Sequence, residues 1–135
     1  MRREFGCEPA DVRAVIGPCI HACCYEVAEE LRECFCSQFA YGEELFREVF
    51  ESDPVREKYP LLFMNMRAPG HGAPPCKPHL DLVEANRRQL VTAGLPEHAI
   101  EIMDLCTACR TDILFSHRAE KGHTGRMMAA IGLAP

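Results

Sequence analysis

The sequence of 135 residues predicts an α+β domain. Stretches with apolar residues three and four positions apart, the spacing of an amphipathic helix, lie in the first and middle parts of the chain. Short apolar runs bounded by small or polar residues, which are typical of buried strands, lie near the start and in the last quarter. We expect a single domain over residues 1–135, because this length, with 47% hydrophobic and 26% charged residues, is ordinary for one globular unit.

The first part of the chain is predicted to hold a strand followed by a helix. Met1 to Gly6 resembles the last turn of a helix that Gly6 closes. Val12 to Ile16 is rich in β-branched residues and predicts a buried strand, which Gly17 and Pro18 end. Tyr25 to Phe39 predicts a helix, because its apolar residues recur on one side and its acidic residues take the other.

The middle of the chain is predicted to hold two more helices, separated by a proline-rich region. Glu43 to Phe50 is interpreted as an amphipathic helix from the spacing of its apolar residues. Leu61 to Met64 predicts a short strand, and Arg67 to Pro78 predicts an exposed loop because prolines and glycines crowd it. Leu80 to Ala93 is the clearest helix, with Gly94 in place to cap its C-terminus.

One polar side chain on this last helix is predicted to be at least partly buried. Asn86 lies one turn after Leu82 and one turn before Leu90, both on the apolar side. A buried amide without a partner costs about 1–3 kcal/mol, so we expect a specific partner. We favour a backbone group as that partner over a bound substrate.

The last quarter of the chain carries the candidate site. Apolar runs at Ile100 to Leu105, Ile113 to Phe115 and Arg126 to Leu133 are interpreted as three strands. Polar residues stand where these runs begin or end, and a sheet would gather those ends in one place. The candidate site residues are Cys106, Thr107, Ser116, His117 and Arg126.

The segment from His117 to Arg126 is locally basic. It holds three cations and one acid, so its charge is +2, whereas the other 125 residues sum to −7 in a chain of net charge −5. A local cationic cleft attracts anions such as phosphate whatever the total charge. The alternative is a solvated hairpin loop that is basic without function. The charges of the segment are Arg118, Lys121, Arg126 and Glu120.

Composition also limits the partners and the location that we expect. The acidic net charge argues against general nucleic-acid binding, which needs a basic face. No stretch approaches the roughly 20 apolar residues that cross a bilayer, and the first residues lack the apolar segment of a secretory signal. We therefore expect a cytoplasmic protein with no membrane and no nucleic-acid partner.

Nine cysteines raise the question of disulfides or a metal site. Their number is odd and the chain is long enough to fold without disulfides, so most are expected to act as small hydrophobes. A four-cysteine zinc site normally needs two C-x-x-C pairs, and only Cys106 and Cys109 form one. We do not favour such a site, nor a thioredoxin-like redox pair, because no βαβ unit surrounds this motif. The other group, expected to run into a helix, is Cys19, His21, Cys23 and Cys24.

Several short blocks of the sequence, in their order and spacing, resemble one known family. That family is the laccase-domain family, also called multicopper polyphenol oxidases and now regarded as purine nucleoside phosphorylases, and the resemblance is to its C-terminal half. It covers nearly all of the chain apart from residues 41–78 and implies an αββα layered sandwich with a mixed sheet. The blocks are Ile16-Gly17-Pro18-Cys19-Ile20, Cys23-Cys24-Tyr25-Glu26-Val27, Leu80-Asp81-Leu82, Asn86-Arg87-Arg88-Gln89-Leu90, Cys106-Thr107, Phe115-Ser116-His117-Arg118 and Thr124-Gly125-Arg126-Met127.

The resemblance implies a zinc-dependent enzyme that cleaves adenosine, inosine, guanosine and methylthioadenosine with phosphate, with adenosine deamination as a side activity. Phosphate attacks the anomeric carbon of ribose as the purine leaves, so the site must hold an oxyanion and stabilise the departing ring. Arg126 is the residue we expect to bind phosphate, because a guanidinium matches its oxygens bidentately. Thr107 and Ser116 would add hydroxyl donors beside His117, and Cys106 would help to form the wall of the pocket.

The sequence departs from the family in its metal-binding part. The family's histidine segment, Ala-Asp-Cys motif and His-Ala-Gly-Trp motif do not occur, and the chain has no tryptophan. We therefore expect an N-terminally truncated domain whose zinc ligands, or copper ligands in the older view of the family, are not in this chain. The expected partners are a purine nucleoside, phosphate and a complementary N-terminal half.

Three functions are consistent with these observations. The first is a nucleoside phosphorylase domain that is active only when its other half is supplied. The second is a non-catalytic remnant that associates with another chain through apolar surface. The third is a copper-dependent polyphenol oxidase, which would need copper ligands, and the histidines are too scattered to propose a set. We expect no turnover from residues 1–135 alone.

Overall fold

The computed structural model describes residues 2–50 and 76–132. Helices and strands are mixed along these residues, and the predicted α+β class is confirmed. Short 3₁₀ turns lie at Pro9–Asp11, Gly42–Leu45 and Glu97–Ala99. The helices and strands, in order, are α1 (Arg2–Phe5), β1 (Ala14–Ile16), α2 (Glu29–Gln38), β2 (Phe46–Phe50), β3 (Cys76–Leu80), α5 (Leu82–Thr92) and β4 (Ile100–Ile102).

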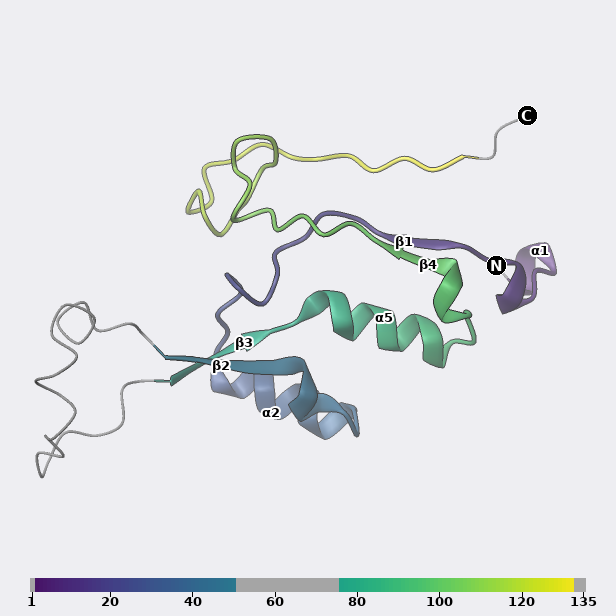
Figure 1. The fold of residues 1–135 in the computed structure, drawn as a ribbon, viewed down its shortest axis with the longest axis horizontal. Coiled ribbons are helices and arrows are strands. Elements are labelled where there is room, and N and C mark those ends of the chain that lie inside the picture. Colours follow the sequence, from purple (N-terminus) through teal and green to yellow (C-terminus); the bar gives the residue numbers. More distant parts are fainter. Residues whose placement is uncertain (1, 51–75, 133–135) are drawn as a thin grey trace, which may run out of the picture.

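Strands β1 and β4 form a parallel pair, although more than half of the described residues lie between them in sequence (Figure 1). Ile16 is aligned with Ile102 at the end of the pair. An isolated parallel bridge between Cys19 and Cys106 extends the pairing beyond the strands. Because parallel strands run in the same direction, the segments that follow them leave from the same edge. The candidate site lies at that edge.

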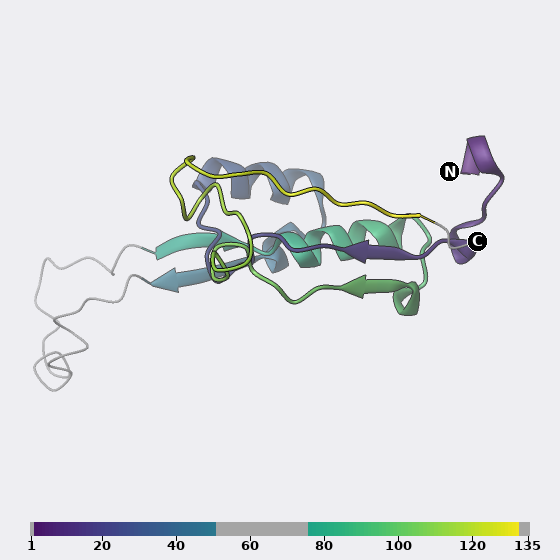
Figure 2. The same cartoon turned by 90° about the horizontal axis from the view of Figure 1, so that it is seen from above.

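Strands β2 and β3 form an antiparallel pair in which Phe46 lies opposite Leu80. Leu45 and Leu80 are fully buried and form the centre of the core with Ala85 of α5. Helix α2 contributes to this core, and α5 also packs against the β1–β4 pair (Figure 2). The core therefore joins the β2–β3 pair to the helices α2 and α5. The partly buried residues around it are Tyr25, Val27, Leu31, Phe35, Tyr41, Phe46 and Leu82.

The predictions for the first forty residues are confirmed with shifted boundaries. Helix α1 ends before Gly6, whose φ of 65° lies in the left-handed region that glycine adopts without strain. Strand β1 is the second part of the predicted strand Val12 to Ile16. Helix α2 begins at Glu29 rather than at Tyr25, so the turn that holds Cys23 and Cys24 does not run directly into the helix.

Helix α5 confirms the clearest helix prediction. The Asp81 carboxylate accepts a hydrogen bond from the backbone N–H of Glu84 at 3.0 Å, which caps the N-terminus. The chain leaves the helix through Gly94, which has a φ of 98°. The predicted burial of Asn86 is wrong, because its side chain is exposed. Its amide does donate to the backbone oxygen of Leu82 at 2.7 Å, so the favoured kind of partner is confirmed.

The predicted helix from Glu43 to Phe50 is wrong. The chain makes a 3₁₀ turn and then the strand β2. Strand β3 pairs with β2, and this ladder outweighs the local helical spacing. Strand β3 also replaces the end of the predicted loop Arg67 to Pro78, and the carbonyl oxygen of Pro78 accepts from the backbone N–H of Val27 at 2.9 Å. The predicted strand Leu61 to Met64 lies outside the described residues.

Two of the three strands predicted in the last quarter are also wrong. The first run does form β4, which ends at Ile102. Ile113 to Phe115 lies in a turn and bend, and the described part of the run from Arg126 has no strand partner and is an extended chain (Figure 1). An apolar run becomes a strand only where a neighbouring strand completes its hydrogen bonds. Among the described helices, none is long and apolar enough to cross a bilayer.

Candidate functional site

The site is built where the segments after β1 and β4 meet. The backbone N–H of Thr107 donates to the carbonyl oxygen of Cys19 at 3.0 Å. The backbone N–H of His21 donates to the Sγ of Cys106 at 3.4 Å. These contacts hold residues far apart in sequence in one fixed arrangement. Two features lie next to each other here. One is a pocket, which Cys19 and Thr107 line, and the other is a group of cysteine thiols, to which Cys106 belongs.

The pocket has a volume of about 370 Å³. Of the five predicted site residues, Thr107, Ser116 and His117 line it. Cys106 is buried next to Thr107 but lies with the thiols. Arg126 is exposed and does not line the pocket, although its neighbour Met127 does. The full lining is Pro18, Cys19, Ile20, Tyr25, Thr107, Phe115, Ser116, His117, Arg118 and Met127.

Two hydroxyl side chains are buried in the pocket wall. Ser116 is 3% exposed and Thr107 is 7% exposed. The Oγ of Ser116 accepts from the backbone N–H of Ala119 at 3.3 Å, while the Glu120 carboxylate accepts from the backbone N–H of Ser116 at 2.8 Å. The hydroxyl of Thr124 donates to the same carboxylate, and these two donors lower the pKa of Glu120. The turn after Ser116 is thereby fixed by its own side chains.

Arg118 is the guanidinium that lines the pocket. It donates to the carbonyl oxygen of Glu26 at 3.0 Å and lies 5.3 Å from the centre of the Tyr25 ring. Sequence reasoning placed Arg118 in the basic segment but assigned anion binding to Arg126. The arrangement of two hydroxyls and one guanidinium around a hollow can hold an oxyanion.

A second hollow, of about 460 Å³, is lined in part by the same two segments, through His21, Cys23 and Asp104. It is lined by Arg47 but also by the three carboxylates of Asp81, Glu84 and Asp104. One nitrogen there, Nε2 of His21, is buried without a hydrogen-bond partner among the described residues. The excess of carboxylates repels phosphate, so this hollow is a poor candidate for the anion site.

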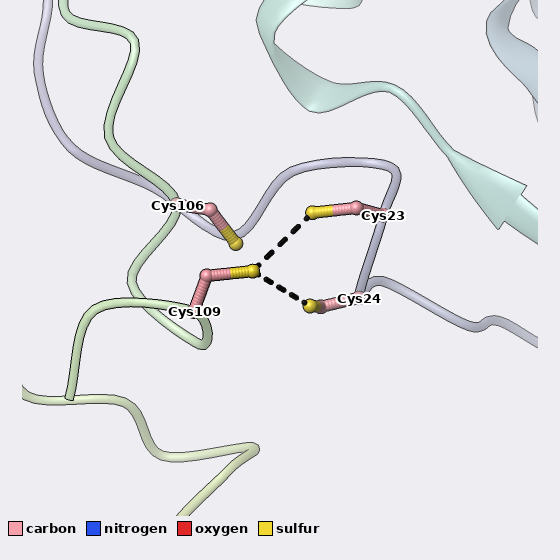
Figure 3. A group of neighbouring side chains, drawn as sticks. All are labelled: Cys23, Cys24, Cys106 and Cys109. Carbon is pink, nitrogen blue, oxygen red and sulfur yellow. Dashed lines mark hydrogen bonds between the residues drawn. The ribbon is translucent and has the colours of Figure 1, made fainter.

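Four cysteines converge beside the pocket (Figure 3). The Sγ atoms of Cys23, Cys24, Cys106 and Cys109 all lie within 4.8 Å of one another. The Sγ of Cys109 is 3.7 Å from that of Cys23 and 3.3 Å from that of Cys24. Two of the thiols come from the turn after β1 and two from the turn after β4. We call these four residues the thiol cluster.

The thiols differ in how readily they lose a proton. Burial of Cys106 opposes its ionisation, but the backbone N–H groups of His21, Cys109 and Ala108 outweigh this and lower its pKa to about 6. Desolvation raises the pKa of Cys23 to about 11 and also raises that of Cys24. The surroundings therefore favour ionisation of Cys106 and oppose that of Cys23 and Cys24.

The structure brings together a four-cysteine group that the sequence interpretation did not favour. Cys23 and Cys24 lie in a turn, and the second pair that a metal site needs is this adjacent pair rather than a second C-x-x-C. A sequence signal did exist. Cys23 and Cys109 each follow by seven residues the aligned strand ends Ile16 and Ile102. That signal becomes visible only once the parallel pairing of the two strands is known.

The thiol cluster does not fit the catalytic zinc that the family resemblance implies. A catalytic zinc usually has three protein ligands and an open position for water or substrate, whereas four thiolates close the coordination sphere. Among the residues that the structure describes, this is the one group of histidines, cysteines and carboxylates placed to hold a metal. A metal held by these four thiolates would therefore have no open position for water or substrate.

Fold and pocket together define a mixed α/β protein with a hollow of about 370 Å³ at the edge of a parallel strand pair. Residues 1–134 match the family described as multi-copper polyphenol oxidoreductase laccase. The chain therefore belongs to this laccase-domain family, which confirms the resemblance seen in the sequence blocks.

Similar proteins carry a more specific name. The chain is 36% identical over 124 residues to the purine nucleoside phosphorylase YlmD of Geobacillus stearothermophilus, covering 92% of this chain and 37% of that protein. It is 30% identical over 131 residues to a purine nucleoside phosphorylase of Bacteroides thetaiotaomicron, covering 97% of this chain and 40% of that protein. The crystal structure of the hypothetical protein YfiH of Bacillus licheniformis matches with a TM-score of 0.67 and 34% identity, covering 92% of this chain and 38% of that chain. The chain thus spans less than half the length of these relatives.

Proposed function

We propose that this chain supplies part of the substrate site of a purine nucleoside phosphorylase. The observation that carries the proposal is the pocket in which the hydroxyls of Thr107 and Ser116 stand beside the guanidinium of Arg118. The names of the similar proteins supply the reaction class, in which phosphate displaces a purine from ribose. As substrates we propose adenosine, inosine, guanosine and methylthioadenosine, with adenosine deamination as a side activity. Zinc is proposed to come with ligands outside this chain.

Within the pocket, the proposed roles follow from what each side chain can donate. The hydroxyls of Thr107 and Ser116 donate to phosphate, and His117 lies beside them. Arg118 is already held by Glu26 and Tyr25, so it contributes a fixed positive charge. Arg126 is exposed and directly precedes Met127 of the pocket lining in sequence, so we propose that its guanidinium reaches the bound phosphate. Cys106 supports the wall from behind, next to Thr107.

Binding of inorganic phosphate tests this proposal directly. We expect phosphate to perturb the NMR amide signals of Thr107, Ser116 and their neighbours. Arg126→Gln and Thr107→Val should each weaken binding by about tenfold or more, because a hydrogen bond to a charged group contributes about 1.5–3 kcal/mol. Arg110→Gln is the matched control, since Arg110 is an exposed arginine that pairs with Asp112 outside the pocket. Equal affinities of the Arg126 and Arg110 variants would remove Arg126 from the site.

A second candidate function, association with another polypeptide, is favoured by the apolar surface. Large hydrophobic side chains are exposed on the β1–β4 pair and along the last quarter of the chain. Apolar patches of this kind mark interaction surfaces. We propose that the occupant is a polypeptide corresponding to the part of the relatives that this chain does not span. The residues are Val15, Ile102, Met103, Ile113, Phe115, Met127, Met128 and Ile131.

The copper-dependent polyphenol oxidase is the weakest of the three functions considered. Copper sites of oxidases are built from several imidazole ligands together. The described histidines do not form such a group, and the group of metal ligands that the described residues do form is made of cysteines alone. The thiol cluster therefore gives no support to an oxidase.

A further inference from the structure

We propose that the thiol cluster binds one zinc ion in a closed, tetrahedral four-thiolate site with a structural role. The ligands are the Sγ atoms of Cys23, Cys24, Cys106 and Cys109. This site is separate from the phosphate pocket, and the inference does not depend on the proposed function. It is also distinct from the zinc that the family resemblance implies, whose ligands we expect outside this chain.

The spacing of the sulfur atoms suits one ion. Zinc binds thiolate sulfur at about 2.3 Å, and a tetrahedron of that size places the sulfur atoms about 3.8 Å apart. In the thiol cluster the Sγ of Cys109 lies 3.7 Å from that of Cys23 and 3.3 Å from that of Cys24, and every pair lies within 4.8 Å. Small side-chain rotations are therefore sufficient to place the four sulfur atoms around a common centre.

The backbone around the thiol cluster is already fixed. The bridge between Cys19 and Cys106 and the hydrogen bond from Thr107 to Cys19 align the two turns. The backbone N–H of His21 points at the Sγ of Cys106 at 3.4 Å. Hydrogen bonds of this kind stabilise negative charge on metal-bound sulfur and orient the ligand. The cluster is thus supported from outside as well as complete in ligand number.

The chemistry of the four ligands selects the ion. Tetrahedral sulfur ligands favour zinc or iron–sulfur centres, and soft thiolates disfavour magnesium and calcium. No carboxylate or imidazole belongs to the cluster. Four thiolates leave no position for water, which is the pattern of structural zinc sites. A redox dithiol would use two of these cysteines and leave the other two unexplained.

Zinc bound here would join the turn after β1 to the turn after β4. Cys19 and Thr107, which line the phosphate pocket, are close in sequence to the ligands on either side. The ion would therefore hold the pocket wall in place without contacting a substrate. Binding would release the protons that remain on the thiols, so affinity should increase with pH.

Metal content and cobalt substitution of the whole 135-residue chain test the proposal. The chain is purified anaerobically with a reductant and titrated with Zn²⁺ against a chromophoric chelator. We expect one zinc ion per chain. Co²⁺ in its place should give the visible bands of a tetrahedral ion and a thiolate-to-cobalt charge-transfer absorption whose intensity corresponds to four sulfur ligands.

Cysteine variants locate the ion. Cys109→Ser should weaken zinc binding more than about 100-fold, because even the loss of an outer hydrogen-bond partner costs 10–100-fold. Cys34→Ser is the matched control, since Cys34 is also exposed but lies on α2, and it should bind zinc like the unaltered chain. If Cys109→Ser does not fold, Cys109→His keeps a ligand and should show the cobalt spectrum with a weaker charge-transfer absorption.

The outcomes that overturn the proposal are equally definite. They are a chain without stoichiometric zinc under reducing conditions, zinc that remains in Cys109→Ser, equal losses in the Cys109 and Cys34 variants, or a cobalt spectrum without sulfur charge transfer. Iron in place of zinc, or a disulfide between Cys24 and Cys109 that persists under reductant, would also overturn it.

Discussion

The Glu84 carboxylate is paired with two arginines of its own helix. It accepts hydrogen bonds from Arg87 at 2.7 and 2.8 Å and from Arg88 at 2.6 Å, all within α5. The hydrogen bonds from Arg87 are the largest cause that lowers its pKa, to about 2, and those from Arg88 add to the effect against partial desolvation. Arg88 also reaches Glu44 in the turn before β2 at 2.8 Å. One carboxylate thus organises two arginines, one of which joins α5 to the hairpin.

We predict that Glu84→Gln lowers the free energy of unfolding by about 1 kcal/mol at pH 7, the order expected for paired charges near the surface. The folded pKa lies below the unfolded value of about 4.3, so this stabilisation is present above that value and is lost as the pH falls toward about 2. Urea unfolding at several pH values should therefore show the difference from the unaltered chain shrinking below pH 4. Glu33→Gln, an exposed glutamate on α2, is the control. A difference independent of pH would contradict this account.

At the scale of the elements, the turn between α2 and β2 requires a glycine at position 42. A Cβ atom at Gly42 would lie 2.6 Å from the Cα of Cys36 and 2.8 Å from the carbonyl oxygen of Phe35. Both are backbone atoms of α2, so no side-chain rotation relieves the clash. The N–H of Gly42 also donates to the carbonyl oxygen of Phe39 at 2.8 Å. The turn is thus held against α2, and Leu45 at its end lies in the core.

Gly42→Ala is predicted to destabilise the fold by about 1–3 kcal/mol, the usual cost of overpacking. Urea unfolding should show a lower midpoint with an unchanged slope. Gly17→Ala provides the comparison, because a Cβ atom there meets nothing within 4 Å. Similar midpoints for the two variants would show that α2 can move away from the turn.

Elements with strong local signals could be predicted from the sequence, and those defined by distant partners could not. Helix α5 has its cap, spacing and terminal glycine within one stretch, so its prediction is confirmed. Strand β2 has apolar residues at helical spacing, and only its partner β3 makes it a strand. The candidate site also has one part with a local sequence signal and one part that depends on distant partners. The pocket residues Thr107, Ser116 and His117 could be chosen from their own segment, whereas the thiol cluster required knowing that β1 and β4 are parallel.

At the scale of the whole molecule, apolar surface is the main feature still to be explained. Met128 and Ile131 are 91% and 90% exposed, and the β1–β4 pair has exposed apolar side chains as well. This amount of uncovered hydrophobic area is costly in water. The chain also spans less than 40% of the YlmD relative. Both observations support the proposal that a further polypeptide covers this surface.

We predict no detectable hypoxanthine from inosine and phosphate with residues 1–135 alone, even with added zinc. The physical reason is that the proposed site is incomplete, because it has phosphate ligands but no open metal position among the described residues. Release of hypoxanthine is measured, and the Geobacillus stearothermophilus relative serves as the positive control. Zinc-dependent release by this chain would overturn the prediction.

The edge at which β1 and β4 end is formed by two segments that are far apart in sequence. Its two sides come from residues 19–24 and 106–109, which meet only in the folded chain. A ligand that contacts both sides therefore binds the native state more tightly than the denatured one, in which a metal ion can still bind cysteines of one side. By mass action, a concentration of 100 times the dissociation constant would add up to about 2.7 kcal/mol of stability. Thermal melting would then report occupancy of this edge before any product is formed.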